Sequence, residues 1–313
     1  MNECGVGYIT GLYWDEGEPA LELLSEPDSG SYERHPLDRG QILSISILGA
    51  ALCIGSFDAV SQRRIPCPRR SPVAGGRDHL CTRCSRAGAN FYARTGIPTG
   101  SYGEARLREQ DHIAYIALFG RSTLKVGVAA TWRSRQRLLE QGAAAALMFV
   151  KGSGDDVREL ERSVAKDIGV RQSIQLHQKL QYLWDLPEQE ESQRTLSTSV
   201  DEIYELLPSL IWERVTPIVN FVYNVPQFRI RGEFQDTRDL ILIEYVHSPD
   251  VITGSIIGCV GQVLLLRAGN DRTYAVDGRA LTGHLVRLSG RGDMSLSGKQ
   301  RIVGRGGNQQ KLF

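Results

Sequence analysis

The chain has 313 residues, of which 41% are hydrophobic and 23% are charged, and its formal net charge is +1. This length and composition are those of a soluble globular protein with two or three domains. A net charge so close to zero excludes attraction of a polyanion by the overall field, so any such attraction has to come from local clusters of charge. No stretch is long and apolar enough to span a bilayer, and residues 1–13 lack the pattern of a signal peptide, so we expect a cytoplasmic protein without membrane partners.

The first informative region follows an apolar segment, residues 42–53, that we expect to be a β-strand. It contains four grouped cysteines, Cys53, Cys67, Cys81 and Cys84, the last two in a Cys-x-x-Cys turn. Such a turn presents two thiolates to one tetrahedral metal ion, and two cysteines from another loop complete a closed structural site. We therefore predict a structural zinc ion here. The alternatives are unligated thiols or a redox pair of Cys81 and Cys84, which would favour a βαβ context that the sequence does not show.

Arginines are concentrated around these cysteines. Eight arginines lie between Gln62 and Arg94, where Asp78 is the one acidic residue. Several prolines and glycines make the stretch loop-like, so metal ligation has to replace a large apolar core as the source of order. The local positive charge predicts a polyanionic partner, DNA or RNA, bound through the arginines of the zinc module.

A mixed pattern of strands and helices begins near residue 112. Residues 113–118 and 124–129 predict two strands joined in a hairpin, and residues 132–141 predict a helix that ends at Gly142. Residues 143–150 fit a buried strand or a short helix, since periodicity alone does not decide. Asp155 is expected to be the N-cap of a further helix that runs through Ile168.

The rest of the chain divides into three segments that differ in composition. Residues 185–205 are acidic and predict a solvated connector that contains a helix. Short β-like runs separated by turns between residues 240 and 288 predict a small antiparallel sheet or barrel. Residues 289–313 are basic and rich in glycine, as is typical of a flexible tail.

Eight residues of the middle region resemble the motif of a known nuclease domain. Tyr115 lies in the first hairpin strand, Lys125-Val126-Gly127 in the second, Arg133, Arg135 and Arg137 on the following helix, and Glu161 on the next helix. This order is similar to that of the GIY-YIG nuclease domain over residues 112–170. Ile113-Ala114-Tyr115 stands in place of Gly-Ile-Tyr, and Lys125-Val126-Gly127 stands in place of Tyr-Ile-Gly.

The resemblance implies cleavage of phosphodiester bonds with a divalent metal ion, Mg²⁺ or Mn²⁺. Glu161 would hold the ion, and Arg137, or failing that Arg135 or Arg133, would stabilise phosphate charge. Tyr115 would orient or deprotonate a water molecule. The first glycine and the second tyrosine of the family pattern are absent, and Lys125 would take the place of that tyrosine. Ala129 stands where a threonine is usual.

The whole chain also resembles an uncharacterised family of bacterial and archaeal proteins. Three stretches carry this likeness: Cys67 with Cys81-x-x-Cys84; His112 to Ala117 with Lys125 to Val128 and Gln141 to Ala143; and Gly254 to Gln262. Members of that family join an N-terminal zinc module to a GIY-YIG-like domain and a C-terminal β segment. The resemblance to them implies no particular activity.

Together these patterns predict an α+β protein whose GIY-YIG-like centre is flanked by a zinc-binding β module and a small antiparallel β domain. The expected boundaries are 1–110 for the N-terminal β segment and zinc module, 111–184 for the GIY-YIG-like domain, 185–226 for the acidic helical connector, 227–290 for the C-terminal β domain, and 291–313 for the basic tail. Two further functions stay open on sequence grounds. One is a small-molecule biosynthetic enzyme built on the degenerate domain, and the other is a non-catalytic adaptor.

Overall fold

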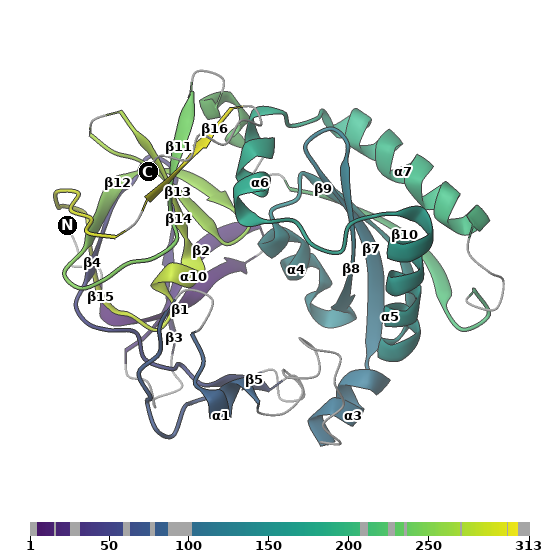
Figure 1. Ribbon diagram of the computed structural model, residues 1–313, viewed down its shortest axis with the longest axis horizontal. Helices are drawn as coiled ribbons and strands as arrows, with labels where there is room; N and C mark the ends of the chain where they lie inside the picture. Colours follow the sequence, from purple (N-terminus) through teal and green to yellow (C-terminus); the bar gives the residue numbers. More distant parts are fainter. Residues whose placement is uncertain are drawn as a thin grey trace. The chain divides into compact units, whose positions relative to one another are not determined.

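A computed structural model shows that the chain forms two compact units, whose elements are labelled in Figure 1. One unit consists of residues 1–105 and 237–304, and we call it the β unit. The other consists of residues 106–236 and 305–313, and we call it the central unit. The structure describes residues 5–15, 17–25, 32–58, 63–75, 79–86, 102–206, 212–224, 229–234, 237–269, 271–298 and 300–305.

The β unit is built on a ten-stranded sheet with the strand order β16-β11-β14-β13-β12-β4-β15-β1-β2-β3. Neighbouring strands are antiparallel, apart from the parallel pair of β11 and β14. The strands are β1 (Val6–Asp15), β2 (Glu18–Leu24), β3 (Tyr32–Pro36), β4 (Ile42–Ile47), β11 (Asp239–Ile243), β12 (Val251–Val260), β13 (Val263–Arg267), β14 (Thr273–Asp277), β15 (Leu285–Ser289) and β16 (Gln300–Gly304). The smaller elements of the unit are the hairpin strands β5 (Ser56–Asp58) and β6 (Arg63–Ile65), and the helices α1 (Thr82–Ser85) and α10 (Gly278–Leu281).

Both ends of the chain contribute to this sheet. The N-terminal strand β1 pairs with β15, and β4 lies between β12 and β15. The expected N-terminal β segment and C-terminal β domain are therefore parts of one sheet, because neither set of strands could pair all its backbone groups and bury its apolar face alone. Strand β16 falls within the expected flexible tail and pairs with β11. Residues 306–313 of that tail lie outside the described residues.

The central unit contains an antiparallel four-stranded sheet with the order β10-β9-β7-β8. Its elements are β7 (Asp111–Phe119), β8 (Thr123–Ala130), the 3₁₀ turn η1 (Thr131–Arg133), α4 (Ser134–Gln141), β9 (Ala145–Ser153), α5 (Gly154–Ser163), the π-helical turn η2 (Val164–Ile168), α6 (Leu176–Gln181), the 3₁₀ turn η3 (Tyr182–Trp184), α7 (Gln189–Leu206), β10 (Thr216–Tyr223) and the 3₁₀ turn η4 (Arg231–Phe234). Helix α3 (Tyr102–Glu109) contains the boundary between the two units.

Helices cover both faces of the central sheet (Figure 1). Helices α5 and α7 pack on one face, where Val157, Leu160 and Leu196 contact side chains such as Ile116 and Phe149. Helix α4 packs on the opposite face, in a cluster that includes Leu138, Ile113 and Tyr115. Strand β7 is buried on both faces as a result, which explains why its sequence is a nearly continuous apolar run.

Local predictions in the central unit have mixed outcomes. Helix α4 ends at Gly142, whose φ of 69° is the left-handed conformation expected of a C-cap glycine. The sequence allowed either a strand or a short helix for the segment after it, and this segment is strand β9. The prediction of Asp155 as the N-cap of the next helix is wrong: Ser153 is the N-cap, and its hydroxyl accepts from the backbone N–H of Asp156 at 3.2 Å.

The expected acidic connector, residues 185–226, belongs to the central unit. Its helix α7 is 18 residues long and buries Leu196, Val200 and Ile203 against the sheet. Its strand β10 adds a fourth strand to the sheet beside β9. The apolar residues of α7 follow helical spacing at i, i+4 and i+7, so an acidic sequence still supplies one apolar stripe to the core.

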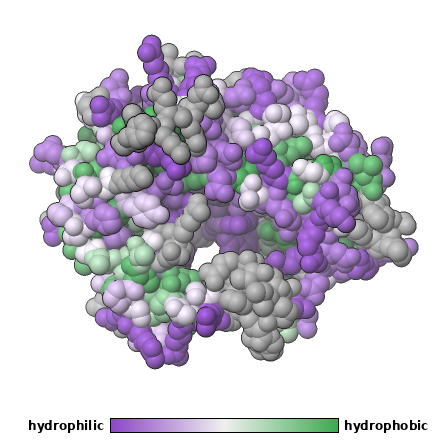
Figure 2. All heavy atoms as spheres, viewed as in Figure 1, coloured by the Kyte–Doolittle hydropathy of each residue, from purple (hydrophilic) through white to green (hydrophobic). Residues whose placement is uncertain are grey.

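Among the described residues, no helix is long and apolar enough to cross a membrane. Hydrophilic side chains dominate the surface seen in Figure 2, with smaller hydrophobic areas between them. Exposed large apolar side chains include Trp132 at 41% and Val219 at 74% of their full accessibility.

Candidate functional site

The four cysteines predicted to bind zinc converge in the β unit. One sulfur atom from each of Cys53, Cys67, Cys81 and Cys84 lies within 4.8 Å of all the others. The Sγ atoms of Cys67 and Cys81 are 3.9 Å apart. Four thiolates at about 2.3 Å from one zinc ion in tetrahedral geometry have sulfur atoms about 3.8 Å apart. The cluster therefore could hold one metal ion, and four thiolates are a donor set that zinc favours.

Backbone hydrogen bonds position the two halves of this cluster. The N–H of Cys53 donates to the carbonyl of Ser71 at 2.8 Å, and the N–H of Val73 donates to Ala51 at 3.0 Å, so the segments on either side of Cys67 run beside each other. Cys81 and Cys84 lie on the single turn of α1, and the N–H of Cys81 donates to the sulfur of Cys53 at 3.2 Å. The Cys-x-x-Cys turn is thereby joined to the widely spaced pair.

The surroundings favour thiolates at two of the four positions. Burial raises the pKa of Cys67, but backbone N–H groups near Ser71 and Arg69 outweigh this effect and lower its pKa to about 7. A backbone hydrogen bond from Cys84 lowers the pKa of Cys81. Burial raises the pKa of Cys53 and of Cys84, and a bound cation would supply the charge that stabilises their thiolates.

Exposed arginines surround the cysteine cluster. Arg69, Arg83 and Arg86 are exposed, as is Arg70. Asp78, the one acidic residue of this stretch, lies outside the described residues. The described surface of the zinc module is thus rich in guanidinium groups, as the sequence predicts.

The second predicted site lies on the α4 face of the central sheet. Tyr115 on β7 is directly opposite Gly127 on β8. A side-chain carbon at Gly127 would lie 2.5 Å from the Tyr115 hydroxyl and 3.1 Å from the ammonium of Lys125. Both functional groups therefore converge above this glycine, and the Lys125 Nζ atom is 5.6 Å from the centre of the Tyr115 ring. Only a residue without a side chain leaves room for this arrangement.

Both groups are buried, which changes their acid–base properties. The Tyr115 side chain is 1% exposed, and burial raises its pKa to about 12. Lys125 is 8% exposed, and burial together with the positive charge of Arg137 lowers its pKa to about 8. At pH 7 about a tenth of Lys125 is therefore neutral, whereas Tyr115 keeps its proton.

Arg137 reaches this cluster from α4. Its guanidinium interacts with Tyr115 through a side-chain hydrogen bond and through charge. Glu140 forms an ion pair with Arg137 at 3.5 Å and another with Arg133 at 2.9 Å. With its side-chain oxygen turned toward Arg137, the buried Gln141 accepts from the same guanidinium at 2.9 Å. The sequence reading assigned no role to Glu140 or Gln141, although their position one turn after Arg137 on the same helix was a usable signal.

Glu161 reaches the cluster from α5. Burial raises the pKa of its half-buried carboxyl group, and the positive charge of Lys125 acts in the opposite direction. Tyr115 and Lys125 therefore lie together over Gly127, and the charges of Arg137 and Glu161 act on both. A π-helical turn begins three residues after Glu161, and such turns are frequent at functional sites.

The ligands available near Glu161 determine whether Mg²⁺ or Mn²⁺ could bind there. The four cysteines are the one group of three or more potential ligands found among the described residues. A divalent ion beside Glu161 would therefore have at most two ligands from the described His, Cys, Asp and Glu side chains. This fits Mg²⁺, which usually binds through one or two carboxylates and keeps water molecules and substrate phosphates as its other ligands.

We expect Gly127→Ala to disturb this cluster more than an ordinary surface substitution. The added methyl group overlaps the Tyr115 ring, whose nearest carbon would be 2.6 Å away. Overpacking of this kind costs about 1–3 kcal/mol, so thermal unfolding should shift down by several degrees. Gly232→Ala is the control, because nothing lies within 4 Å of a carbon added there. Equal melting temperatures for the two variants would contradict the tight packing of Tyr115 on Gly127.

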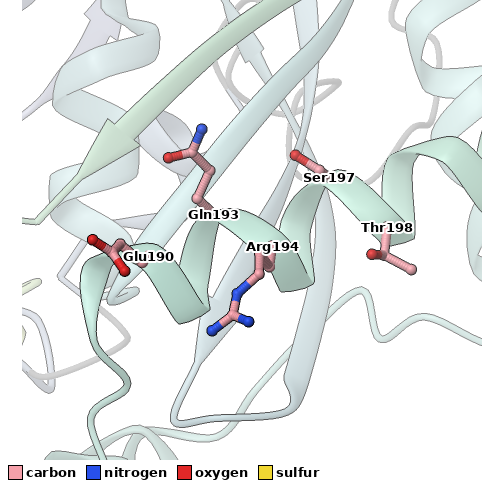
Figure 3. Close-up of a pocket in the computed structure, with 5 residues that line it drawn as sticks. All are labelled: Glu190, Gln193, Arg194, Ser197 and Thr198. Atoms are coloured by element: carbon pink, nitrogen blue, oxygen red, sulfur yellow. The ribbon is translucent and has the colours of Figure 1, made fainter.

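One open hollow lies along the outer surface of α7, lined by Glu190, Gln193, Arg194, Ser197 and Thr198 (Figure 3). These residues are spaced as one face of a single helix, and none of them belongs to either cluster. The side chains in Figure 3 are spread along the helix instead of converging on one point. We assign no site to this hollow.

Comparison with known protein families gives one match. A family described as protein of unknown function (DUF2797) matches residues 80–286, about two-thirds of the chain. The chain belongs to this family. The match includes Cys81 and Cys84 of the zinc cluster and all four residues of the Tyr115 cluster, whereas Cys53 and Cys67 precede it. The curated proteins and the solved structures contain no match to the chain.

Proposed function

We propose that this DUF2797 protein is a zinc-containing nucleic-acid-binding protein whose central unit hydrolyses phosphodiester bonds in the manner of a GIY-YIG nuclease. The observation that carries the proposal is the convergence of one hydroxyl and one amine above Gly127, with one guanidinium and one carboxylate near enough to act on both by charge. The hairpin, the arginine helix and the glutamate helix that supply them follow one another in the order of that family. The exposed arginines of the zinc module support an anionic partner.

Each group of the cluster has a chemical role in this reaction. Arg137, held by Glu140 and Gln141, donates hydrogen bonds to phosphate oxygens and stabilises their charge. Tyr115 keeps its proton at neutral pH and therefore acts as a hydrogen-bond donor that orients the attacking water. Lys125, with a pKa of about 8, is the group best matched to accept a proton near neutrality.

The reaction balances as a hydrolysis. The oxygen of water forms a bond to phosphorus, and the bond from phosphorus to the leaving oxygen breaks. The proton of water passes to the neutral amine of Lys125, and the leaving oxygen takes up a proton from solvent. A divalent ion held by Glu161 would supply stabilisation of the charge that develops on the phosphate and the leaving group. The zinc ion of the four cysteines has a structural role, since all four of its ligands come from the protein.

The test is cleavage of labelled single- and double-stranded DNA and RNA with added Mg²⁺ or Mn²⁺. Glu161→Gln is expected to lower the cleavage rate at least tenfold while nucleic acid is still bound, because the substitution removes the charge that holds the ion but keeps the shape of the side chain. Cleavage products are resolved on denaturing gels, and binding is measured in parallel.

Glu159→Gln is the matched control. Glu159 lies on the same helix, is 46% exposed and forms an ion pair with Arg214 at 2.9 Å. A surface pair of this kind contributes at most about 1 kcal/mol to stability, so cleavage should be unchanged. Binding without cleavage by the wild-type protein would contradict the catalytic part of the proposal, and absence of binding to every nucleic acid tested would overturn it entirely.

A further inference from the structure

An exposed tryptophan stands beside the predicted catalytic cluster. Trp132 lies in η1, between the end of β8 and the start of α4, and is 41% exposed. Large aromatic side chains are mostly buried in folded proteins, and an exposed one offers a flat apolar face on which a ligand can stack. Its neighbours Thr131, Arg133, Ser134 and Arg135 are polar or charged.

The arginines of this region divide into two kinds. Arg133 and Arg137 are bound to Glu140. Arg135 is exposed, and within the described ranges no hydrogen bond or ion pair joins it to another residue. An arginine without a carboxylate partner is available to an external anion, and its planar guanidinium matches the oxygens of a phosphate group.

A series of side-chain contacts connects Trp132 with the cluster. The guanidinium of Arg133 lies 5.8 Å from the centre of the Trp132 ring. Arg133 binds Glu140 at 2.9 Å, Glu140 binds Arg137 at 3.5 Å, and Arg137 contacts Tyr115. All of these residues belong to the central unit. The exposed tryptophan therefore lies at one end of a continuous row of side chains that leads to the proposed site of hydrolysis.

We propose that Trp132 and Arg135 form a docking site for single-stranded nucleic acid, in which Trp132 stacks on an unpaired base and Arg135 contacts an adjacent phosphate. This inference rests on the proposed function and restricts its substrate to single-stranded nucleic acid. In a duplex both faces of each base are covered by neighbouring bases, so an aromatic side chain stacks only on a base that is unpaired or displaced. An aromatic ring next to an unpaired arginine is the combination that single-strand binding surfaces use.

The experiment compares two oligonucleotides that differ only in their bases. A fluorescently labelled single strand and an abasic strand of the same length are titrated with the Glu161→Gln protein, without added divalent metal, so that binding is read without cleavage. Trp132→Ala, introduced into this background, is expected to bind the normal single strand about 5- to 150-fold more weakly. Its affinity for the abasic strand should be unchanged, and Trp132→Phe should keep most of the affinity.

Arg135→Gln gives the complementary result. It should weaken binding of both strands and lower the slope of log affinity against log salt concentration by about 0.7, the amount expected for one lost contact to a single-strand phosphate. Val219→Ala removes a side chain that is 74% exposed on β10 and should change neither measurement. Thermal unfolding of each variant verifies that it is folded.

The possible failures are distinguishable. If Trp132→Ala binds the normal strand as tightly as its parent, or loses equal affinity for the abasic strand, base stacking at Trp132 is overturned while the proposed hydrolysis still stands. If the protein prefers duplex to single strand, the substrate assignment is overturned. If no nucleic acid binds even at low salt, the proposed function itself is overturned, and the docking site with it.

Discussion

Cys84→Ser should yield protein without bound zinc, whereas the wild-type chain should carry about one zinc ion per molecule. A serine hydroxyl is a poor substitute for a thiolate, and Cys84 is one of four sulfur atoms within 4.8 Å of one another. Metal content is measured by mass spectrometry on both proteins. The same loss is expected for Cys81→Ser, which removes the other sulfur of the Cys-x-x-Cys turn.

Loss of the ion should also unfold the zinc module. The buried hydrophobic cluster of this region consists of Cys53, Cys67 and Cys84 with Val73, Leu80 and Cys81 packed against it, so the metal ligands themselves make up most of the core. Zinc contributes on the order of 10–16 kcal/mol to the folding of small zinc domains. We therefore expect rapid proteolysis within residues 50–100 of Cys84→Ser, followed in time by mass spectrometry of the fragments.

Cys259→Ala provides the control for these variants. Cys259 is fully buried on β12 of the same unit and lies outside the cluster. Its substitution should retain zinc and leave residues 50–100 resistant to protease, although the large sheet loses some packing. Zinc retained by Cys84→Ser, or absent from the wild-type chain, would contradict assignment of the cluster to this metal.

The cluster of four cysteines was predictable because its strongest signal is local. A Cys-x-x-Cys turn constrains its own backbone, and few other functions require two cysteines at that spacing. The partners Cys53 and Cys67 were predicted only from their grouping with this turn in the sequence. What joins them to the turn, a pair of backbone hydrogen bonds between residues 51–53 and 71–73, leaves no pattern in the sequence.

The ten-stranded sheet was not predicted for a related reason. Strand pairs such as β1 with β15 join residues almost 280 positions apart, and alternation within a strand says which face is buried but not which strand lies beside it. The hairpin of β7 and β8 was predicted correctly because its two strands are joined by a turn of three residues. Helix α7 was predicted as a solvated connector because its acidic residues outweigh the few apolar residues that contact the sheet.

The Tyr115 cluster, like the cluster of cysteines, was predicted from the sequence only in part. The motif order placed Tyr115, Lys125, Arg137 and Glu161 on two strands and two helices, and in the structure the charges of Arg137 and Glu161 act on both Tyr115 and Lys125. The sequence did not reveal that Glu140 and Gln141 hold Arg137, or that Lys125 is buried. The second of these features determines the chemistry available to the cluster.

Lys125→Met should abolish most hydrolysis and, at the same time, stabilise the folded protein at neutral pH. A buried general base contributes about 10²- to 10⁴-fold to a reaction rate, so the cleavage rate should fall by that factor. Lys125→Arg should be equally inactive, because a guanidinium does not lose its proton. Restoration of cleavage by the arginine variant would show that Lys125 supplies only positive charge.

The effect on stability follows from the depressed pKa of Lys125. Folding lowers this pKa from its ordinary value of 10.5 to about 8, because the amine is buried and faces Arg137, with Glu161 only partly compensating. Between pH 8 and 10.5 the unfolded chain therefore binds more protons than the folded chain, and stability rises with pH across that interval. Below pH 8 the folded protein carries the full cost of a buried charge, about 3 kcal/mol.

Replacement by methionine removes this cost together with its pH dependence. The free energy of unfolding, measured by denaturant titration between pH 7 and 10, should rise with pH for the wild-type protein more steeply than for Lys125→Met. Tyr115 has the opposite effect above pH 10, because its folded pKa of about 12 makes the folded state retain a proton that the unfolded chain loses. A residue whose removal stabilises the fold and stops the reaction is retained for chemistry. Parallel stability curves for the two proteins would instead mean that Lys125 titrates as an ordinary surface lysine and has no part in proton transfer.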